Sequence, residues 1–171
     1  MVKTTKCLNE WNAVVEALGE GIQTLLIRKY QTSVGSFILY PTKSYAMKDD
    51  FLHAFKEEYH DFVEERKFPD MREGIPAVKY FAEVVEVLER PSNRLGRFND
   101  YHIWSPGHVR SYLDSKAYVW ILRVSVLDEP VFTDRTRGLI YANTLEPVDV
   151  SDAKPVISDD KFSSILDELQ E

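Results

Sequence analysis

The sequence predicts an α+β domain built on a small mixed or closed β-barrel with inserted helices. Segments rich in β-branched and aromatic residues recur along most of the chain, and helical segments fall between them. No regular alternation of strand and helix occurs, which argues against a doubly wound parallel sheet. The length of 171 residues suffices for one domain with a sizeable core. We expect this α+β domain to span residues 1–150, followed by an acidic C-terminal segment, 151–171, that contains a short helix.

The N-terminal part is predicted to begin with a β-hairpin. Trp11–Leu18 and Ile22–Arg28 are the two candidate strands, and Gly19-Glu20-Gly21 between them is typical of a turn. A further short strand is expected over Phe37–Tyr40, stopped by Pro41, because proline cannot donate a backbone hydrogen bond.

The clearest helix is predicted over 49–65. Asp49 or Asp50 can cap its first turn, and the apolar residues that follow recur at near-helical spacing. His53, Glu57 and His60 would lie on one face of this helix, but the many acidic residues around them indicate a solvated surface. We therefore expect no metal site.

The second half alternates strong strands with short helices. Val78–Glu89 and Ala117–Leu127 are rich in β-branched and aromatic residues and predict two long strands. Ser105-Pro106 places a capping residue and a first-turn proline before a short helix over 106–115. Lys161–Glu171 predicts the acidic C-terminal helix.

Composition narrows the class of protein. The single cysteine, Cys7, excludes an internal disulfide and a zinc site made of several cysteines. No apolar leader and no long apolar stretch occur, so we expect a cytoplasmic protein without a membrane partner. The motifs that hold dinucleotides or nucleoside triphosphates are absent, and no cofactor is expected. The net charge of -7 argues against a general, sequence-blind binder of duplex DNA.

Positive charge is nevertheless concentrated in two blocks. From Gly21 to Lys48 there is no acidic residue, while basic residues dominate from Arg90 to Leu127. In the first block, Arg28-Lys29 and Tyr40 to Lys43 stand at strand ends, which suits a rim that binds phosphates. Solvated strand ends are the structural alternative.

The centre of the second block combines a histidine, a tryptophan and an arginine. His102 and Trp104 would face the same side of an extended segment, and Arg110 follows. Tryptophan can stack on a base, and arginine can grip a phosphate or a guanine. Alternatively, Trp104 fills the core and His102 bonds a backbone carbonyl.

These segments carry a family resemblance. The residues that carry it are Trp11 to Leu18, Leu25-Leu26-Ile27-Arg28-Lys29, Phe37-Ile38-Leu39-Tyr40-Pro41-Thr42, His102-Ile103-Trp104 with Arg110, and Trp120-Ile121-Leu122-Arg123-Val124 leading to Pro130. Over most of residues 8–150 the chain resembles the prokaryotic family of unknown function numbered eighteen hundred and two. It departs from that pattern at Tyr30-Gln31-Thr32 and from Tyr141 to Val150.

A looser likeness concerns the fold. The order of elements is similar to that of small barrels of the PUA, ASCH and EVE type. This resemblance implies binding of RNA, or capture of a flipped, modified base in an aromatic-lined pocket.

Three hypotheses of function follow. The first is a module that binds RNA or an unstacked base, with Arg28, Lys29, Tyr40, Lys43, His102, Trp104 and Arg110 as the binding residues and no catalytic residue. The second is a nuclease-like enzyme with His102 as general base and Arg28, Lys29 or Arg110 stabilising phosphate charge. The third is a protein-interaction module that uses the acidic stretch 128–171. The sequence leaves the oligomeric state open.

Overall fold

The computed structural model describes residues 2–171. Its strands are β1 (Lys3–Trp11), β2 (Leu25–Arg28), β3 (Ser36–Thr42), β4 (Met71–Arg72), β5 (Ile75–Pro91), β6 (Lys116–Phe132), β7 (Tyr141–Asp149) and β8 (Lys154–Pro155). Its helices are α1 (Asn12–Gly19), α2 (His60–Glu65), α3 (Pro106–Tyr112) and α4 (Asp159–Gln170). Short 3₁₀ turns lie at Ser44–Met47, Phe51–Ala54, Glu57–Tyr59 and Gly96–Tyr101.

The strands form one mixed sheet with the order β2-β6-β5-β3-β1-β7, and β4 and β8 add short pairings to β5 and β6. The β1–β3 pair is parallel and the other pairs are antiparallel. The predicted α+β class with a mixed sheet is confirmed, but the prediction of a closed barrel is wrong. The edge strands β2 and β7 do not pair with each other. A hydrogen bond between the hydroxyls of Thr32, in the segment after β2, and Tyr141 of β7 joins these two sides of the sheet.

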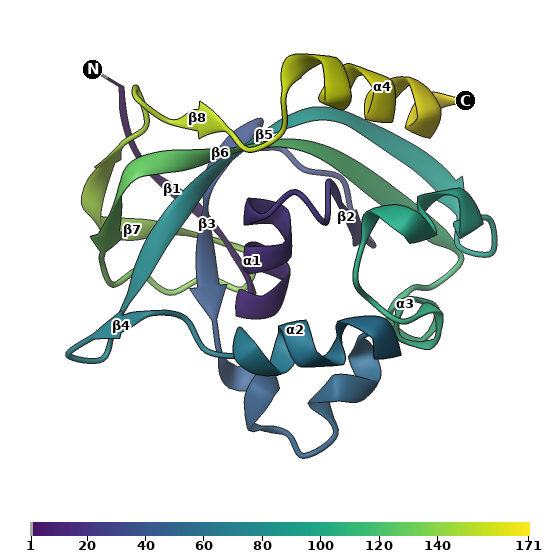
Figure 1. The fold of residues 1–171 in the computed structure, drawn as a ribbon, viewed down its shortest axis with the longest axis horizontal. Coiled ribbons are helices and arrows are strands. Elements are labelled where there is room, and N and C mark those ends of the chain that lie inside the picture. The colour runs from purple at the N-terminus through teal and green to yellow at the C-terminus, as the bar shows by residue number, and fades with distance from the viewer. Residues whose placement is uncertain (1) are drawn as a thin grey trace.

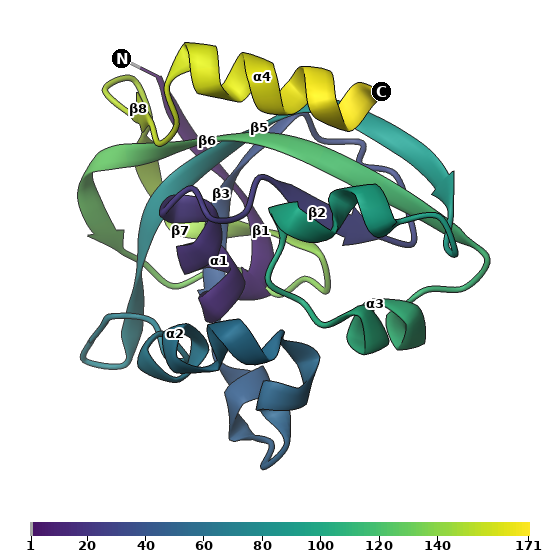
Figure 2. The same ribbon diagram turned by 45° about the vertical axis from the view of Figure 1, so that its right-hand side comes forward.

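The strand predicted over Trp11–Leu18 is wrong, because Asn12–Gly19 forms helix α1. The strands curve around this helix in Figures 1 and 2, and its residues from Asn12 to Leu18 are all buried. A helix that is buried on every side has no polar face, so its sequence lacks helical periodicity and resembles that of a buried strand.

The glycines expected to form a hairpin turn end this helix. Gly21 has a φ of 77°, and its N–H donates to the carbonyl of Leu18 over 3.3 Å. The N–H of Ile22 donates to the carbonyl of Ala17 over 3.0 Å. This pair of bonds is the Schellman motif, in which a left-handed residue satisfies the last carbonyls of a helix.

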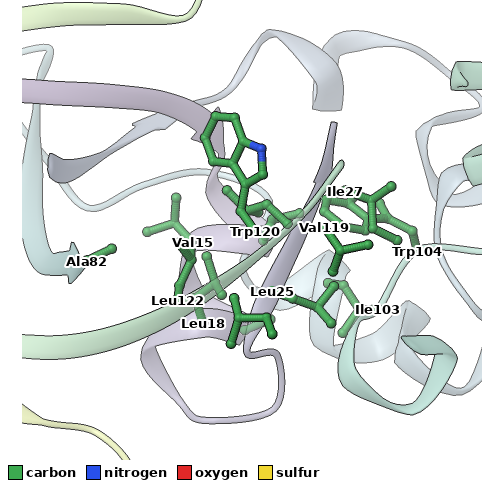
Figure 3. Packing of buried hydrophobic residues seen from close by; sticks show 14 of the residues in the cluster. Val15, Leu18, Leu25, Ile27, Ala82, Ile103, Trp104, Val119, Trp120 and Leu122 are labelled. Atoms are coloured by element: carbon green, nitrogen blue, oxygen red, sulfur yellow. The ribbon is translucent and has the colours of Figure 1, made fainter. Parts of the chain in front are cut away.

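The main core lies between α1 and the sheet. Figure 3 shows Val15 and Leu18 of α1 beside Leu25 of β2 and Leu122 of β6, with Trp120 above them. Trp120 is fully buried, and its indole N–H donates to the carbonyl of Tyr30 over 3.1 Å. This bond fixes the backbone just after β2.

The single helix predicted over 49–65 is also wrong. The segment is broken into two 3₁₀ turns and the short helix α2. Phe55 is extended, forms an antiparallel bridge with Trp104 and is buried. The neighbouring Lys56 N–H donates to the carbonyl of Ile103 over 3.0 Å. These contacts with a distant segment override the helical spacing of the apolar residues.

The two long strands and the two helices predicted in the second half agree with β5, β6, α3 and α4, whereas β7 and β8 were not predicted. The long strands β5 and β6 pair along most of their length. The hydroxyl of Ser105 accepts from His108 N at the start of α3, and that of Ser158 accepts from Lys161 N at the start of α4. Helix α4 lies across β5 and β6 at the top of Figures 1 and 2, and its Phe162 and Leu169 join the main core. Among residues 2–171, no helix is long and apolar enough to cross a membrane.

Candidate ligand-binding cleft

A cleft of about 770 Å³ opens where three strands end. Strands β1 and β3 run in parallel, with Glu10 beside Pro41 and Trp11 beside Thr42, so their carboxyl ends meet at one edge. The end of β2 at Arg28, helix α3, the segment from Pro69 to Pro76 around β4, Trp104 and the loop 134–139 also contribute to the lining. Crevices at the carboxyl ends of strands are common ligand sites, and this volume is within the usual range for small-molecule pockets.

The cleft contains an ion pair between Arg28 and Glu10. The two side chains are 11% and 6% exposed, and an Arg28 amino group donates to the Glu10 carboxylate. The other carboxylate oxygen accepts from the backbone N–H of Trp11 over 2.9 Å. Burial lowers the pKa of Arg28, but the Glu10 carboxylate, together with Tyr30 and Tyr112, raises it, and the pKa lies above its ordinary value. The guanidinium therefore stays charged at neutral pH.

Aromatic side chains form one wall. The ring of Trp11 lies 5.4 Å from that of His108, and the ring of His108 stacks 6.5 Å from that of Tyr112. Behind the wall, Tyr45 stacks on Trp11 at 5.0 Å with an interplanar angle of 9°. Burial lowers the pKa of His108, although Glu10 acts in the opposite direction. The His108 ring is thus uncharged at neutral pH.

Tyr30 also lines the cleft, next to Arg28. Burial raises the pKa of Tyr30 to about 12, although the nearby Arg28 lowers it. The phenol consequently keeps its proton and remains a hydrogen-bond donor at neutral pH.

The outer lining carries most of the remaining charge. Lys43, Arg135 and Arg137 are its cations, and Asp134 is its one acidic residue apart from the paired Glu10. Arg135 lies over the ring of Tyr40, with its guanidinium carbon 5.2 Å from the ring centre. An acidic protein thus has a locally positive cleft mouth, which attracts anions.

The loop that carries the two arginines is held in place by β1. Asn9 donates from its side chain to the carbonyl of Gly138 and from its backbone to that of Ile140, each over 2.9 Å. A Cβ at Gly138 would lie 1.9 Å from the carbonyl oxygen of Tyr141, so glycine is required at this close approach.

The structure brings together only some of the predicted binding residues. Arg28, Tyr40, Lys43 and Trp104 line the cleft. Lys29 lies beside it, with its ammonium group 5.0 Å from the centre of the Tyr112 ring. Tyr40 and Trp104 are only 3% and 4% exposed, which leaves little of either ring free to stack on a ligand.

His102 and Arg110 line a different hollow of about 370 Å³. Val109 contributes to both hollows and lies between these two residues and the cleft lining. His102 is 4% exposed, and burial, aided by the charge of Lys56, lowers its pKa to about 3. Such an imidazole is a weak base, so its environment does not support the role of general base.

Sequence reasoning missed much of the cleft. Trp11 was named in a candidate strand and in the family resemblance but not as a binding residue. The other missed residues are Glu10, Tyr30, His108, Tyr112, Arg135 and Arg137. Arg135 and Arg137 are two apart within an acidic stretch, and a charge count over shorter windows would have revealed them. Glu10 meets Arg28 only through the fold, so no local pattern indicates this pair.

Comparison with known proteins agrees with the resemblances. Residues 7–168 match a family described as a domain of unknown function (DUF1802). No curated protein matches the chain.

Crystal structures of the ASCH protein from Zymomonas mobilis have a similar fold. A mutant of that protein with one serine replaced by alanine has a TM-score of 0.53 at 12% identity, with 95% of this chain and 94% of that chain covered. The unmutated protein has a TM-score of 0.47 at 12% identity, with 95% and 93% covered. At this identity the structure of the serine-to-alanine mutant supports a shared fold, and the weaker match adds no argument.

Proposed function

The chain belongs to the DUF1802 family, a family of unknown function. We propose that it is a nucleic-acid-binding module, which takes one unstacked nucleotide of RNA or single-stranded DNA into the cleft. The observation that carries this proposal is the combination, in one cleft, of an aromatic wall and a positive mouth. Single-stranded nucleic acids are commonly bound by these two features together.

The parts of the cleft suit different parts of a nucleotide. Lys43, Arg135 and Arg137 at the mouth would contact phosphates. The rings of Trp11, His108 and Tyr112 would stack on the base.

The inner groups would contact the polar edge of the base. The guanidinium of Arg28 and the phenol of Tyr30 can donate hydrogen bonds, and the carboxylate of Glu10 can accept them. The ion pair holds the Arg28 guanidinium and the Glu10 carboxylate in place before a ligand binds, which reduces the entropy lost on binding.

The enzymatic and protein-interaction hypotheses have less support. The buried imidazole of His102 is a weak base outside the cleft. The acidic stretch from 128 to 171 provides two strands of the sheet and the core residues Phe162 and Leu169, so much of it packs within the fold.

Removing a cation from the cleft mouth tests the proposal. We expect the wild-type protein to bind a short fluorescein-labelled RNA or single-stranded DNA, measured by anisotropy from about 50 to 200 mM salt. Lys43→Ala and Arg137→Ala should each weaken binding and reduce the slope of log affinity against log salt by about 0.7, because each removes one phosphate contact.

Lys48→Ala is the matched control. Lys48 is exposed and belongs to the same basic block, but it does not line the cleft, so its replacement should leave the salt slope unchanged. Absence of binding by the wild-type protein, or equal effects of all three replacements, would refute the proposed function.

A further inference from the structure

The loop 134–139 carries an unusual leucine at the mouth of the cleft. Leu139 is 99% exposed, which is the greatest exposure of any large apolar side chain among residues 2–171. Gly138 and Leu139 both line the cleft. An isolated exposed leucine needs no explanation on a surface, but this one lies beside a candidate binding site.

The position of Leu139 is fixed by the residues on either side of it. The carbonyls of Gly138 and Ile140 both accept hydrogen bonds from Asn9 of β1. Further back, the N–H of Thr136 donates to the carbonyl of Asn143 over 2.8 Å, and the hydroxyl of Thr136 accepts from Asn143 N over 3.0 Å. The backbone therefore holds the leucine away from the core rather than allowing it to fold back.

The charge around Leu139 indicates what covers it. Arg137 is two residues away in the same loop, and Arg135 and Lys43 also line the cleft. A partner that buries the leucine must also bring negative charge to these cations. A nucleic-acid helix does both, because its stacked bases are apolar and its phosphates are anionic. Leucine is one of the side chains that proteins insert between base steps.

We propose that Leu139 is a wedge, which enters the base stack of a double-stranded nucleic acid and frees the adjacent nucleotide for the cleft. This inference rests on the proposed function and extends it from single strands to base-paired ones. Opening a base pair and unstacking its base costs free energy, and burial of the leucine between the neighbouring bases offsets part of that cost.

The test compares duplex and single-stranded probes. Each probe contains 2-aminopurine, whose fluorescence rises when the base leaves the stack. The duplex is prepared both as RNA and as DNA, which shows which of the two nucleic acids the protein recognises. Wild-type protein should bind one of the duplexes and increase its fluorescence. Leu139→Ala should weaken duplex binding by about tenfold and abolish the increase, since a buried leucine changes an affinity by at least this factor. Its affinity for the single strand should fall by much less than its affinity for the duplex, because no stack has to be opened.

Two variants complete the design. Leu139→Met should keep the wild-type behaviour, since methionine also serves as a wedge. Leu145→Ala is the matched control, because Leu145 is 61% exposed on β7 but does not line the cleft.

The outcomes separate this inference from the proposed function. Wild-type protein that binds the single strand but neither duplex, or binds a duplex without a rise in fluorescence, overturns the wedge and leaves the proposed function intact. Equal weakening of single-strand and duplex binding by Leu139→Ala also overturns the wedge. Absence of binding to every probe overturns the proposed function itself.

Discussion

Replacement of Glu10 by alanine is expected to lower the free energy of unfolding by about 3 kcal/mol, because it leaves the Arg28 guanidinium buried without its counter-ion. Only 11% of the Arg28 side chain is exposed, and its nearest acidic partner is Glu10. The cleft gives the guanidinium some access to water, which places the effect toward the lower end of the range for broken buried pairs. Urea unfolding of both proteins measures the difference.

Two further variants identify the origin of this effect. Glu20→Ala removes one of the two acidic partners of Arg66, in a more exposed pair whose side chains are 40% and 30% exposed, and should cost less than about 1 kcal/mol. The double variant Glu10→Leu with Arg28→Met should recover stability relative to Glu10→Ala, because no unpaired charge remains. If the double variant were as unstable as Glu10→Ala or less stable, packing rather than charge would explain the loss.

The second large effect is a dependence of stability on pH through His102. Burial and Lys56 hold its pKa at about 3 in the folded protein, whereas an unfolded histidine has a pKa near 6.5. The unfolded chain binds the proton more readily, so stability is greatest above pH 6.5 and falls as the pH decreases from there toward 3. Between pH 7 and pH 5 this one group should remove about 2 kcal/mol of stability.

His102→Gln should reduce that loss, because glutamine does not titrate. The quantity to measure is the difference between the free energies of unfolding at pH 7 and pH 5, which should be about 2 kcal/mol smaller in the variant than in the wild type. His53→Gln replaces an exposed histidine and serves as the control. Equal pH dependence in His102→Gln and the wild type would mean that the environment of His102 does not lower its pKa in the folded state.

The elements that the sequence predicted correctly are those with strong local signals. The β-branched runs within β5 and β6 and the capping serine Ser105 act over a few residues and need no distant partner. Helix α1 was mistaken for a strand because burial on every side removes the polar face that distinguishes a helix. Gly21 carries a signal for either a hairpin turn or a helix end, and only the surrounding fold decides between them.

The candidate site was predictable only in part, because several of its residues come together only through contacts between distant segments. Arg28 and Lys43 could be found because charges at strand ends emerge at the edge of a sheet. His102 and Arg110 have suitable chemistry but line another hollow, because α3 begins between them and directs Arg110 away from the cleft. The aromatic wall depends on the meeting of β1 with α3, which are about a hundred residues apart in the sequence.

The most direct measurement of the central claim is the site at which the nucleic acid contacts the protein. An oligonucleotide containing 4-thiouridine can be cross-linked by light, and mass spectrometry then identifies the attached peptides. The proposed function predicts cross-links to Trp11, to the α3 residues His108 and Tyr112, or to the loop 134–139, all of which line the cleft. Cross-links concentrated on α4, or at Arg110 beside the second hollow, would contradict it.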